Sequence, residues 1–190
     1  MKTKSVMIVG VGGQGSLLAS KLLGHLLLTQ GFDVKVSEVH GMSQRGGSVV
    51  TYVRYGDQVY SPVIDRGEAD YIVSFELLEA ARWLPFLKKD GQIVTNIQQI
   101  DPMPVITGAA VYPEDLVAKL KNSGAKVDAL DCLKLAEEAG SAKAVNLVLM
   151  GRLSHYFDLP EEAWMRSLEA NVPAKFLELN KKAFELGKNA

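Results

Sequence analysis

The chain has 190 residues, of which 47% are hydrophobic and 23% are charged, a composition typical of a soluble globular protein and of one domain spanning residues 1–190. Lys and Arg together number 21 against 22 Asp and Glu, so the formal net charge is −1. Because phosphate contacts need a basic surplus, this balance argues against a nucleic-acid-binding protein.

The cysteine count and the apolar stretches further restrict the class of protein to which the chain can belong. Cys132 is the only cysteine, which is too few for an intrachain disulfide or for an iron–sulfur cluster, so we expect a buried thiol and no metal site. The first apolar run breaks at once into glycines, unlike a secretion signal. The next run, residues 17–28, contains Lys21 and His25 and is too short to span a bilayer. A cytoplasmic protein without a membrane partner is therefore predicted.

The N-terminal pattern predicts the start of a Rossmann-like fold. Residues 5–9 are apolar and β-branched and are followed by glycine, which indicates a buried strand. The Leu-rich segment 14–30 ends at Gly31, as helices often do. Residues 32–37 then alternate like a second strand. Together they predict a βαβ unit whose two strands are parallel neighbours.

The rest of the chain alternates between strand and helix patterns. Residues 48–55 are rich in β-branched side chains, and Gly56-Asp57 separates them from residues 58–61, which predicts a hairpin and hence some antiparallel pairing. Further strands are expected at 69–75, 91–96 and 126–130, and helices at 76–87, 113–121, 133–157 (divided at Gly140-Ser141), 161–169 and 173–188. The predicted fold class is a three-layer α/β/α architecture with a mixed, mostly parallel sheet and a helical C-terminal third.

A glycine fingerprint, Gly10-x-Gly12-x-x-Gly15, occupies the first predicted strand-to-helix turn. Glycines allow a tight turn and let backbone N–H groups approach an anion at a helix N-terminus. Glu38 ends the second predicted strand, where a Rossmann enzyme carries its ribose-binding carboxylate. One interpretation is therefore an NAD(P)-dependent oxidoreductase, and another is that the glycines only shape the turn. No later residues supply an obvious hydride-transfer site.

The second motif is the segment from Glu38 to Ser48, whose glycines favour a loop. Polar loops at the carboxyl ends of strands are where open α/β sheets bind ligands, so we expect this loop close to the first glycine turn. Arg45 is suited to grip a phosphate, a carboxylate or an acidic group of a partner. His40 is either an acid–base group or pairs locally with the backbone or with Glu38.

These two segments supply the candidate site residues. The catalytic candidates are Glu38, His40 and Arg45. The candidate cofactor-binding residues are Gly10, Gly12, Gly13, Gln14, Gly15, Ser43, Gln44, Arg45, Gly46 and Gly47. A ligand-binding or scaffold protein without redox chemistry is a third interpretation that the residues leave open.

Taken together, the chain resembles the gamma-type domain of the 2-oxoacid:ferredoxin oxidoreductases over nearly its whole length. The segments that carry this resemblance are Gly10-Val-Gly-Gly-Gln-Gly15, Glu38-Val-His-Gly-Met-Ser-Gln-Arg-Gly-Gly47, Ser61-Pro62, Asp70, Asn146-Leu-Val-Leu-Met-Gly151 and Leu179-Asn-Lys-Lys-Ala-Phe184. Within that family the length and the form of residues 40–45 are most similar to the small subunits that serve indolepyruvate and other arylpyruvates.

The resemblance implies oxidative decarboxylation of a 2-oxoacid, with CoA as co-substrate, to acyl-CoA and carbon dioxide, with ferredoxin as the electron acceptor. It also implies a larger partner subunit that carries thiamine diphosphate and [4Fe-4S] clusters, so this chain alone is expected to be inactive. Its two glycine-rich loops are then expected to line the approach of substrate or CoA. A homodimer is a possible state of the isolated chain.

Overall fold

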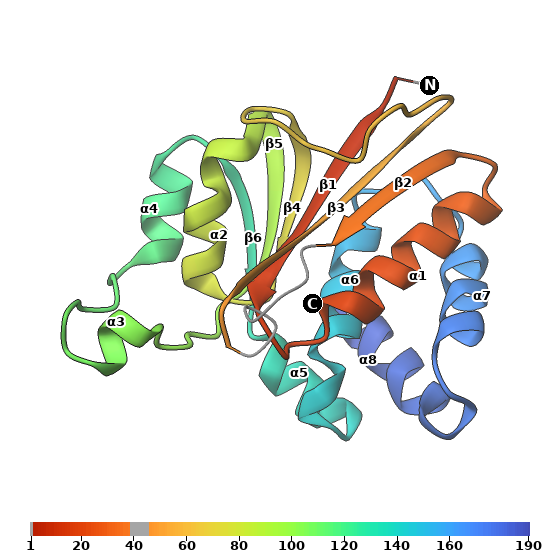
Figure 1. Cartoon of the computed structure of the whole chain (residues 1–190). Helices are drawn as coiled ribbons and strands as arrows, with labels where there is room; N and C mark the ends of the chain where they lie inside the picture. Colours follow the sequence, from red (N-terminus) through yellow and green to blue (C-terminus); the bar gives the residue numbers. More distant parts are fainter. Residues whose placement is uncertain (1, 39–45) are drawn as a thin grey trace.

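The computed structural model describes residues 2–38 and 46–190, and its strands form one mixed sheet (Figure 1). The strands are β1 (Lys4–Val11), β2 (Asp33–Glu38), β3 (Ser48–Gly56), β4 (Ala69–Ser74), β5 (Leu87–Asn96) and β6 (Lys126–Leu130). Their order across the sheet is β2-β3-β1-β4-β5-β6. The pairs β1–β4, β4–β5 and β5–β6 are parallel, whereas β3 is antiparallel to both β1 and β2. The sheet is therefore mixed and mostly parallel, as predicted.

Helices cover both faces of this sheet, so the fold has three layers. They are α1 (Ser16–Thr29), α2 (Leu77–Trp83), η2 (Leu84–Phe86), α3 (Met103–Ile106), α4 (Leu116–Asn122), α5 (Cys132–Ala139), η3 (Ala142–Ala144), α6 (Val145–Ser154), α7 (Glu161–Asn171), η4 (Ala174–Phe176) and α8 (Leu177–Asn189). Buried side chains of α2 and α4 pack on one face, and those of α1 and α5 to α8 belong to the core on the other face (Figure 1). The α/β/α layers and the helical C-terminal third are confirmed.

The central strand β1 shows why the sheet is buried on both sides. Val6 and Ile8 point into the core that α1 lines, whereas Met7 and Val9 point into the core that α2 lines, and all four side chains are fully buried. A continuous apolar run is what a strand with helices on both faces requires. The carboxyl end of β1 is therefore held between the two helical layers.

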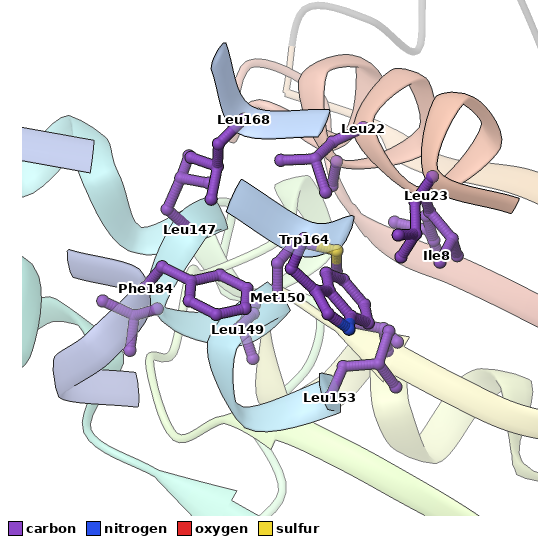
Figure 2. Packing of buried hydrophobic residues seen from close by; sticks show 14 of the residues in the cluster. Ile8, Leu22, Leu23, Leu147, Leu149, Met150, Leu153, Trp164, Leu168 and Phe184 are labelled. Carbon is purple, nitrogen blue, oxygen red and sulfur yellow. The ribbon is translucent and has the colours of Figure 1, made fainter. Parts of the chain in front are cut away.

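The C-terminal helices close the larger core (Figure 2). Trp164 of α7 packs against Phe184 of α8, with ring centroids 5.6 Å apart. On its other side α7 is tied to α1, because the Ser167 hydroxyl donates to the Leu22 carbonyl at 2.7 Å and lies 3.2 Å from Nδ1 of His25. This polar contact gives His25 a structural role.

The order of the first three strands corrects the sequence-based prediction. β1 and β2 run in the same direction, but they are not neighbours, because β3 lies between them and is antiparallel to both. The predicted hairpin between residues 48–55 and 58–61 is also wrong. Residues 58–61 are not a strand. Instead the Val59 N–H donates to the carboxylate of Asp33 at 2.7 Å, so a side chain satisfies the backbone there.

Several element boundaries also differ from the prediction, among them the starts of β5 and α4. β5 begins at Leu87 instead of Gly91, and Asp90 within it has a φ of 66°, which locally breaks the alternation that a strand pattern needs. α4 begins at Leu116, because Asp115 before it adopts a left-handed conformation with a φ of 53° and so cannot continue the helix backwards to Pro113. Within the described ranges, no helix is both long enough and apolar enough to cross a membrane.

Helices α6 and α8 cross at two glycines. A Cβ atom on Gly151 would lie 2.0 Å from the Phe184 carbonyl oxygen, and one on Gly187 would lie 2.0 Å from the Val148 carbonyl oxygen. The two backbones therefore touch, and no side chain fits between them.

We predict that Gly187→Ala lowers the free energy of unfolding by about 2 kcal/mol or more, since the added methyl group overpacks a backbone contact. The matched control is Gly24→Ala in α1, whose added Cβ would lie 3.6 Å from Val36, an ordinary contact. Gly24→Ala is expected to leave stability unchanged or to raise it by up to about 1 kcal/mol, because alanine favours the helix. Urea unfolding of both variants checks this, and equal effects would contradict the close crossing.

Candidate functional site

The first glycine turn lies at the carboxyl end of β1, where the side chain of Gln14 folds back on it. The Val11 N–H donates to Oε1 of Gln14 at 2.8 Å, and Nε2 of Gln14 donates to the Phe75 carbonyl at 3.0 Å. A Cβ on Gly10 would lie 2.9 Å from both Gln14 Oε1 and Phe75 Cβ, so glycine is required there. Gln14 thus joins the ends of β1 and β4.

The second glycine segment meets this turn directly. The Gly12 N–H donates to the Gly47 carbonyl at 2.9 Å, and the Gly46 N–H donates to the Gly12 carbonyl at 3.3 Å. The predicted proximity of the two glycine-rich segments is confirmed for these residues. Its cause is the antiparallel strand β3, which starts beside the end of β1, and not a parallel neighbour.

Positive φ angles explain two further glycines of the turn. Gly13 has a φ of 103° and Gly15 a φ of 90°, which is the left-handed region that side chains disfavour. A Cβ on Gly15 would also lie 3.0 Å from Nδ2 of Asn146 in α6. Asn146 is 5% exposed, so a buried amide of the C-terminal part closes this turn from behind.

Glu38 is placed differently from a ribose-binding carboxylate. It ends β2, an edge strand of the sheet, and accepts a hydrogen bond from the Ser20 hydroxyl of α1 at 2.8 Å. Because β3 separates β2 from β1, Glu38 does not follow a strand adjacent to the glycine turn. The other candidates in this loop, His40, Ser43, Gln44 and Arg45, lie outside the described residues.

The carboxyl end of β5 contributes another buried amide. Asn96 is fully buried, and its Nδ2 donates to the Phe75 carbonyl at 3.2 Å. Its Oδ1 accepts the N–H of Cys132 at 3.2 Å, at the start of α5. The Phe75 carbonyl therefore receives two amide donors, from Gln14 and from Asn96, and connects three strand ends.

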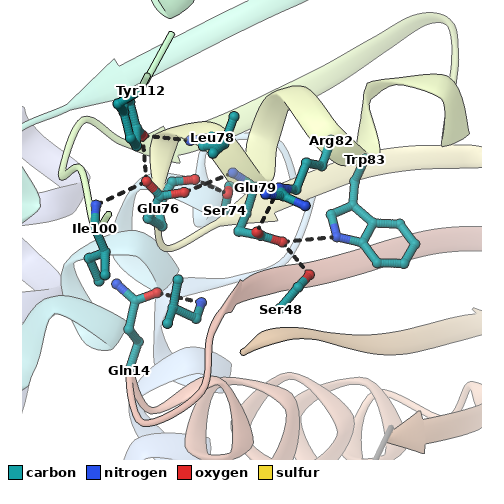
Figure 3. Close-up of polar contacts among 11 residues, drawn as sticks. Gln14, Ser48, Ser74, Glu76, Leu78, Glu79, Arg82, Trp83, Ile100 and Tyr112 are labelled. Carbon is teal, nitrogen blue, oxygen red and sulfur yellow. Dashed lines mark hydrogen bonds and ion pairs between the residues drawn. The ribbon is translucent and has the colours of Figure 1, made fainter. Parts of the chain in front are cut away.

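A buried carboxylate, Glu76, follows β4 at the same edge (Figure 3). It is 1% exposed and accepts hydrogen bonds from the Glu79 N–H at 2.8 Å and from the Ile100 N–H at 3.1 Å. The Tyr112 hydroxyl donates to the same oxygen that accepts from Ile100, at 2.5 Å. Glu76 also supplies the N-cap of α2. A carboxylate with these donors is suited to hold structure, because both of its oxygens already accept hydrogen bonds within the chain.

A second carboxylate, Glu79, lies one turn further along α2 and is 4% exposed. It accepts from the Ser48 hydroxyl of β3 and from Nε1 of Trp83 at 3.3 Å, and it pairs with Nε of Arg82 at 3.2 Å (Figure 3). Burial raises the pKa of Glu79, and the lowering effects of Ser48, Arg82 and Trp83 only partly offset this. Glu79 thus links α2 to the start of β3, beside the glycine contact.

Sequence reasoning missed Glu76, Glu79 and Asn96 as parts of this edge. A usable signal was present, since Glu76 follows one predicted parallel strand and Asn96 is the last residue of another, where such sheets gather polar side chains. Glu76 and Glu79 also have the spacing of an N-cap and its third residue.

The donors at this edge do not form a metal site. Over residues 2–38 and 46–190, no group of three or more His, Cys, Asp or Glu side chains is arranged to hold a metal ion. Cys132 is fully buried, and burial raises the pKa of its thiol. The amides and hydroxyls at this edge already form hydrogen bonds within the chain, so they hold the glycine turn and its surroundings in a fixed shape.

We predict that the stability difference between wild type and Glu79→Gln depends on pH. A carboxyl whose pKa is raised on folding stabilises the fold below the unfolded value of 4.5, and this contribution is lost as the pH rises through the folded pKa. Wild type should therefore lose stability relative to Glu79→Gln as the pH rises from about 4 to about 8. Urea unfolding across that range measures it, and a constant difference would contradict the raised pKa.

The comparisons with known proteins give the family. The family model described as "Pyruvate ferredoxin/flavodoxin oxidoreductase" matches residues 5–190. The chain therefore belongs to the pyruvate ferredoxin/flavodoxin oxidoreductase family, which confirms the resemblance drawn from its motifs. Within that family it is 46% identical, over 100% of its own length and 96% of the relative's, to "Indolepyruvate oxidoreductase subunit IorB" of Thermococcus kodakarensis.

Solved structures share the fold. The pyruvate oxidoreductase subunit PORC of Thermotoga maritima matches with a TM-score of 0.76 and 21% identity, over 100% of this chain and 97% of that one. The 2-oxoglutarate:ferredoxin oxidoreductase of Magnetococcus marinus, solved with 2-oxoglutarate, coenzyme A and succinyl-CoA bound, matches with a TM-score of 0.72 and 20% identity. That match covers 100% of this chain and 31% of the longer chain.

Proposed function

We propose that this chain is the small subunit of a 2-oxoacid:ferredoxin oxidoreductase that acts on arylpyruvates such as indolepyruvate. The observation that carries the proposal is the full-length identity of 46% to a protein named as a subunit of indolepyruvate oxidoreductase. A relative of 36% identity from Archaeoglobus fulgidus bears the same name over 97% of this chain. In this proposal the complex converts the 2-oxoacid and CoA to acyl-CoA and carbon dioxide and passes the electrons to ferredoxin.

The redox groups of the complex are assigned to a larger partner subunit. Four thiolates generally hold an iron–sulfur cluster, and this chain has one cysteine, which is fully buried. The residues therefore do not fit a cluster, and the described carboxylates do not fit a divalent ion for thiamine diphosphate. In this proposal the small subunit contributes a binding surface and contacts with the partner subunit.

The contribution of this chain is proposed to come from the carboxyl edge of its sheet. Gly12 and Gly47 hold the two glycine-rich segments together there, so the glycine turn lies beside the start of β3. We infer that this region lines the approach of substrate or CoA in the assembled enzyme, with Arg45 as its anion-binding group. Glu38 and His40 remain candidate catalytic residues.

An NAD(P)-dependent oxidoreductase is less well supported. The strand that would carry the ribose carboxylate next to the glycine turn is replaced by antiparallel β3. The Gly12 N–H, which would face a pyrophosphate, already donates to the Gly47 carbonyl. Both features reduce the fit to a dinucleotide.

We expect co-expression with the larger subunit to yield a complex that reduces ferredoxin or a dye with indolepyruvate and CoA. The isolated chain is expected to show no such activity, because it lacks the redox groups. Loss of the chain from the complex should abolish turnover. A larger subunit that is fully active without this chain, or micromolar NADH binding by the isolated chain in calorimetry, would contradict the proposal.

We expect Arg45→Ala to lower kcat/KM of the assembled enzyme by roughly tenfold or more, since charge-assisted hydrogen bonds contribute about 1.5–3 kcal/mol. Arg45→Lys is the matched control, because it keeps the charge but loses the bidentate fork. The melting temperature of the chain should stay unchanged in both variants. A large fall in melting temperature with unchanged activity per complex would show a structural role instead.

A further inference from the structure

One projecting segment of the molecule has no described role in the fold. Residues 101–111, here called the arm, stand out from the carboxyl edge around α3, beyond α2 and α4 (Figure 1). Met103 and Ile106 are each 65% exposed, and Val111 is 85% exposed. Ile97, just before the arm, is 40% exposed. Large apolar side chains gathered on one projection are typical of an interaction site.

The arm is held in one shape in spite of its exposure. Glu76 anchors both ends, since it accepts from the Ile100 N–H before the arm and from the Tyr112 hydroxyl after it (Figure 3). Within the arm the Ala110 N–H donates to the Pro104 carbonyl at 2.9 Å, which closes the loop on itself. A segment ordered in advance loses less entropy when it binds.

The charged residues in the arm and in the segments next to it along the sequence all have one sign. Between Gly91 and Ala118 the sequence contains no Lys or Arg, and its charged residues are Asp101, Glu114 and Asp115. An isologous contact with a second copy would bring these acidic groups together, which is unfavourable. The complementary surface is an apolar groove with a rim of Lys and Arg.

We propose that the arm docks into such a groove on the larger subunit of the complex. This inference rests on the proposed function and adds the surface through which the two subunits hold together. The same carboxylate that anchors the arm also caps α2, and Glu79 of that helix accepts from Ser48 next to the glycine contact. Because Glu76 joins the arm to α2, docking of the arm also positions the carboxyl edge of the sheet against the partner.

The test measures the affinity of the full-length chain for the larger subunit by calorimetry. Ile106→Asp is expected to raise Kd roughly 100-fold, because it puts a carboxylate into an apolar contact whose residues carry much of the binding energy. Leu28→Asp is the matched control. Leu28 is 58% exposed at the far end of α1, so its substitution should leave Kd within about threefold. Circular dichroism and melting temperature confirm that both variants fold.

A cross-linking experiment gives a second readout. Cys132 is fully buried, so a cysteine placed at Val111 is the reactive thiol for a maleimide photo-cross-linker. Val111→Cys should cross-link to the larger subunit, and Leu28→Cys should not. If wild type binds the larger subunit but Ile106→Asp binds equally well, the arm is not the docking site and the proposed function stands.

Two further outcomes would also overturn the inference. If wild type shows no binding to the larger subunit at all, the proposed function fails with it. If Ile106→Asp instead changes only the oligomeric state of the isolated chain, the arm contacts a second copy.

Discussion

The buried carboxylate of Glu76 is the contact on which the carboxyl edge of the sheet depends. A charge with 1% of its surface exposed is costly unless donors surround it. Its donors come from the first turn of α2, from the Ile100 backbone and from the Tyr112 hydroxyl. Glu76 thus fixes the start of α2 and holds both ends of the segment that follows β5. Burial and the bond to Glu76 both raise the pKa of Tyr112, so this donor stays protonated.

Beside this carboxylate, neutral amides join the ends of the central strands. Gln14 and Asn96 both donate to the Phe75 carbonyl, which ties β1, β4 and β5 together at one atom. Amides satisfy buried backbone groups without the cost of a further charge. The glycine turn and Gly47 are held at this rigid edge by backbone hydrogen bonds. This rigid edge is the surface that we propose faces the partner subunit.

The sequence predicted most strands and helices because their signals are local. The apolar run of β1 and the Gly140 break between α5 and α6 depend on neighbours along the chain, and both were located well. The order of strands was missed, since the insertion of β3 between β1 and β2 depends on pairing between distant residues. Glu76 was assigned only to a helix start, because its role requires Ile100 and Tyr112, which are distant in sequence.

The candidate site was predictable to a similar extent. The meeting of the two glycine-rich segments was foreseen, and the contacts of Gly12 with Gly46 and Gly47 confirm it. The position of Glu38 was not foreseen, because its distance from the turn depends on the strand order. The roles assigned to the remaining loop residues stay predictions.

We propose that the carboxyl edge of this chain faces its partner subunit. Hydrogen–deuterium exchange of the chain, alone and in complex with the larger subunit, tests this claim most directly. We expect binding to slow exchange in peptides covering residues 10–16 and 97–112, and to leave α7 and the outer end of α1 unchanged. Protection confined to the opposite edge of the sheet, or no change on mixing, would contradict it.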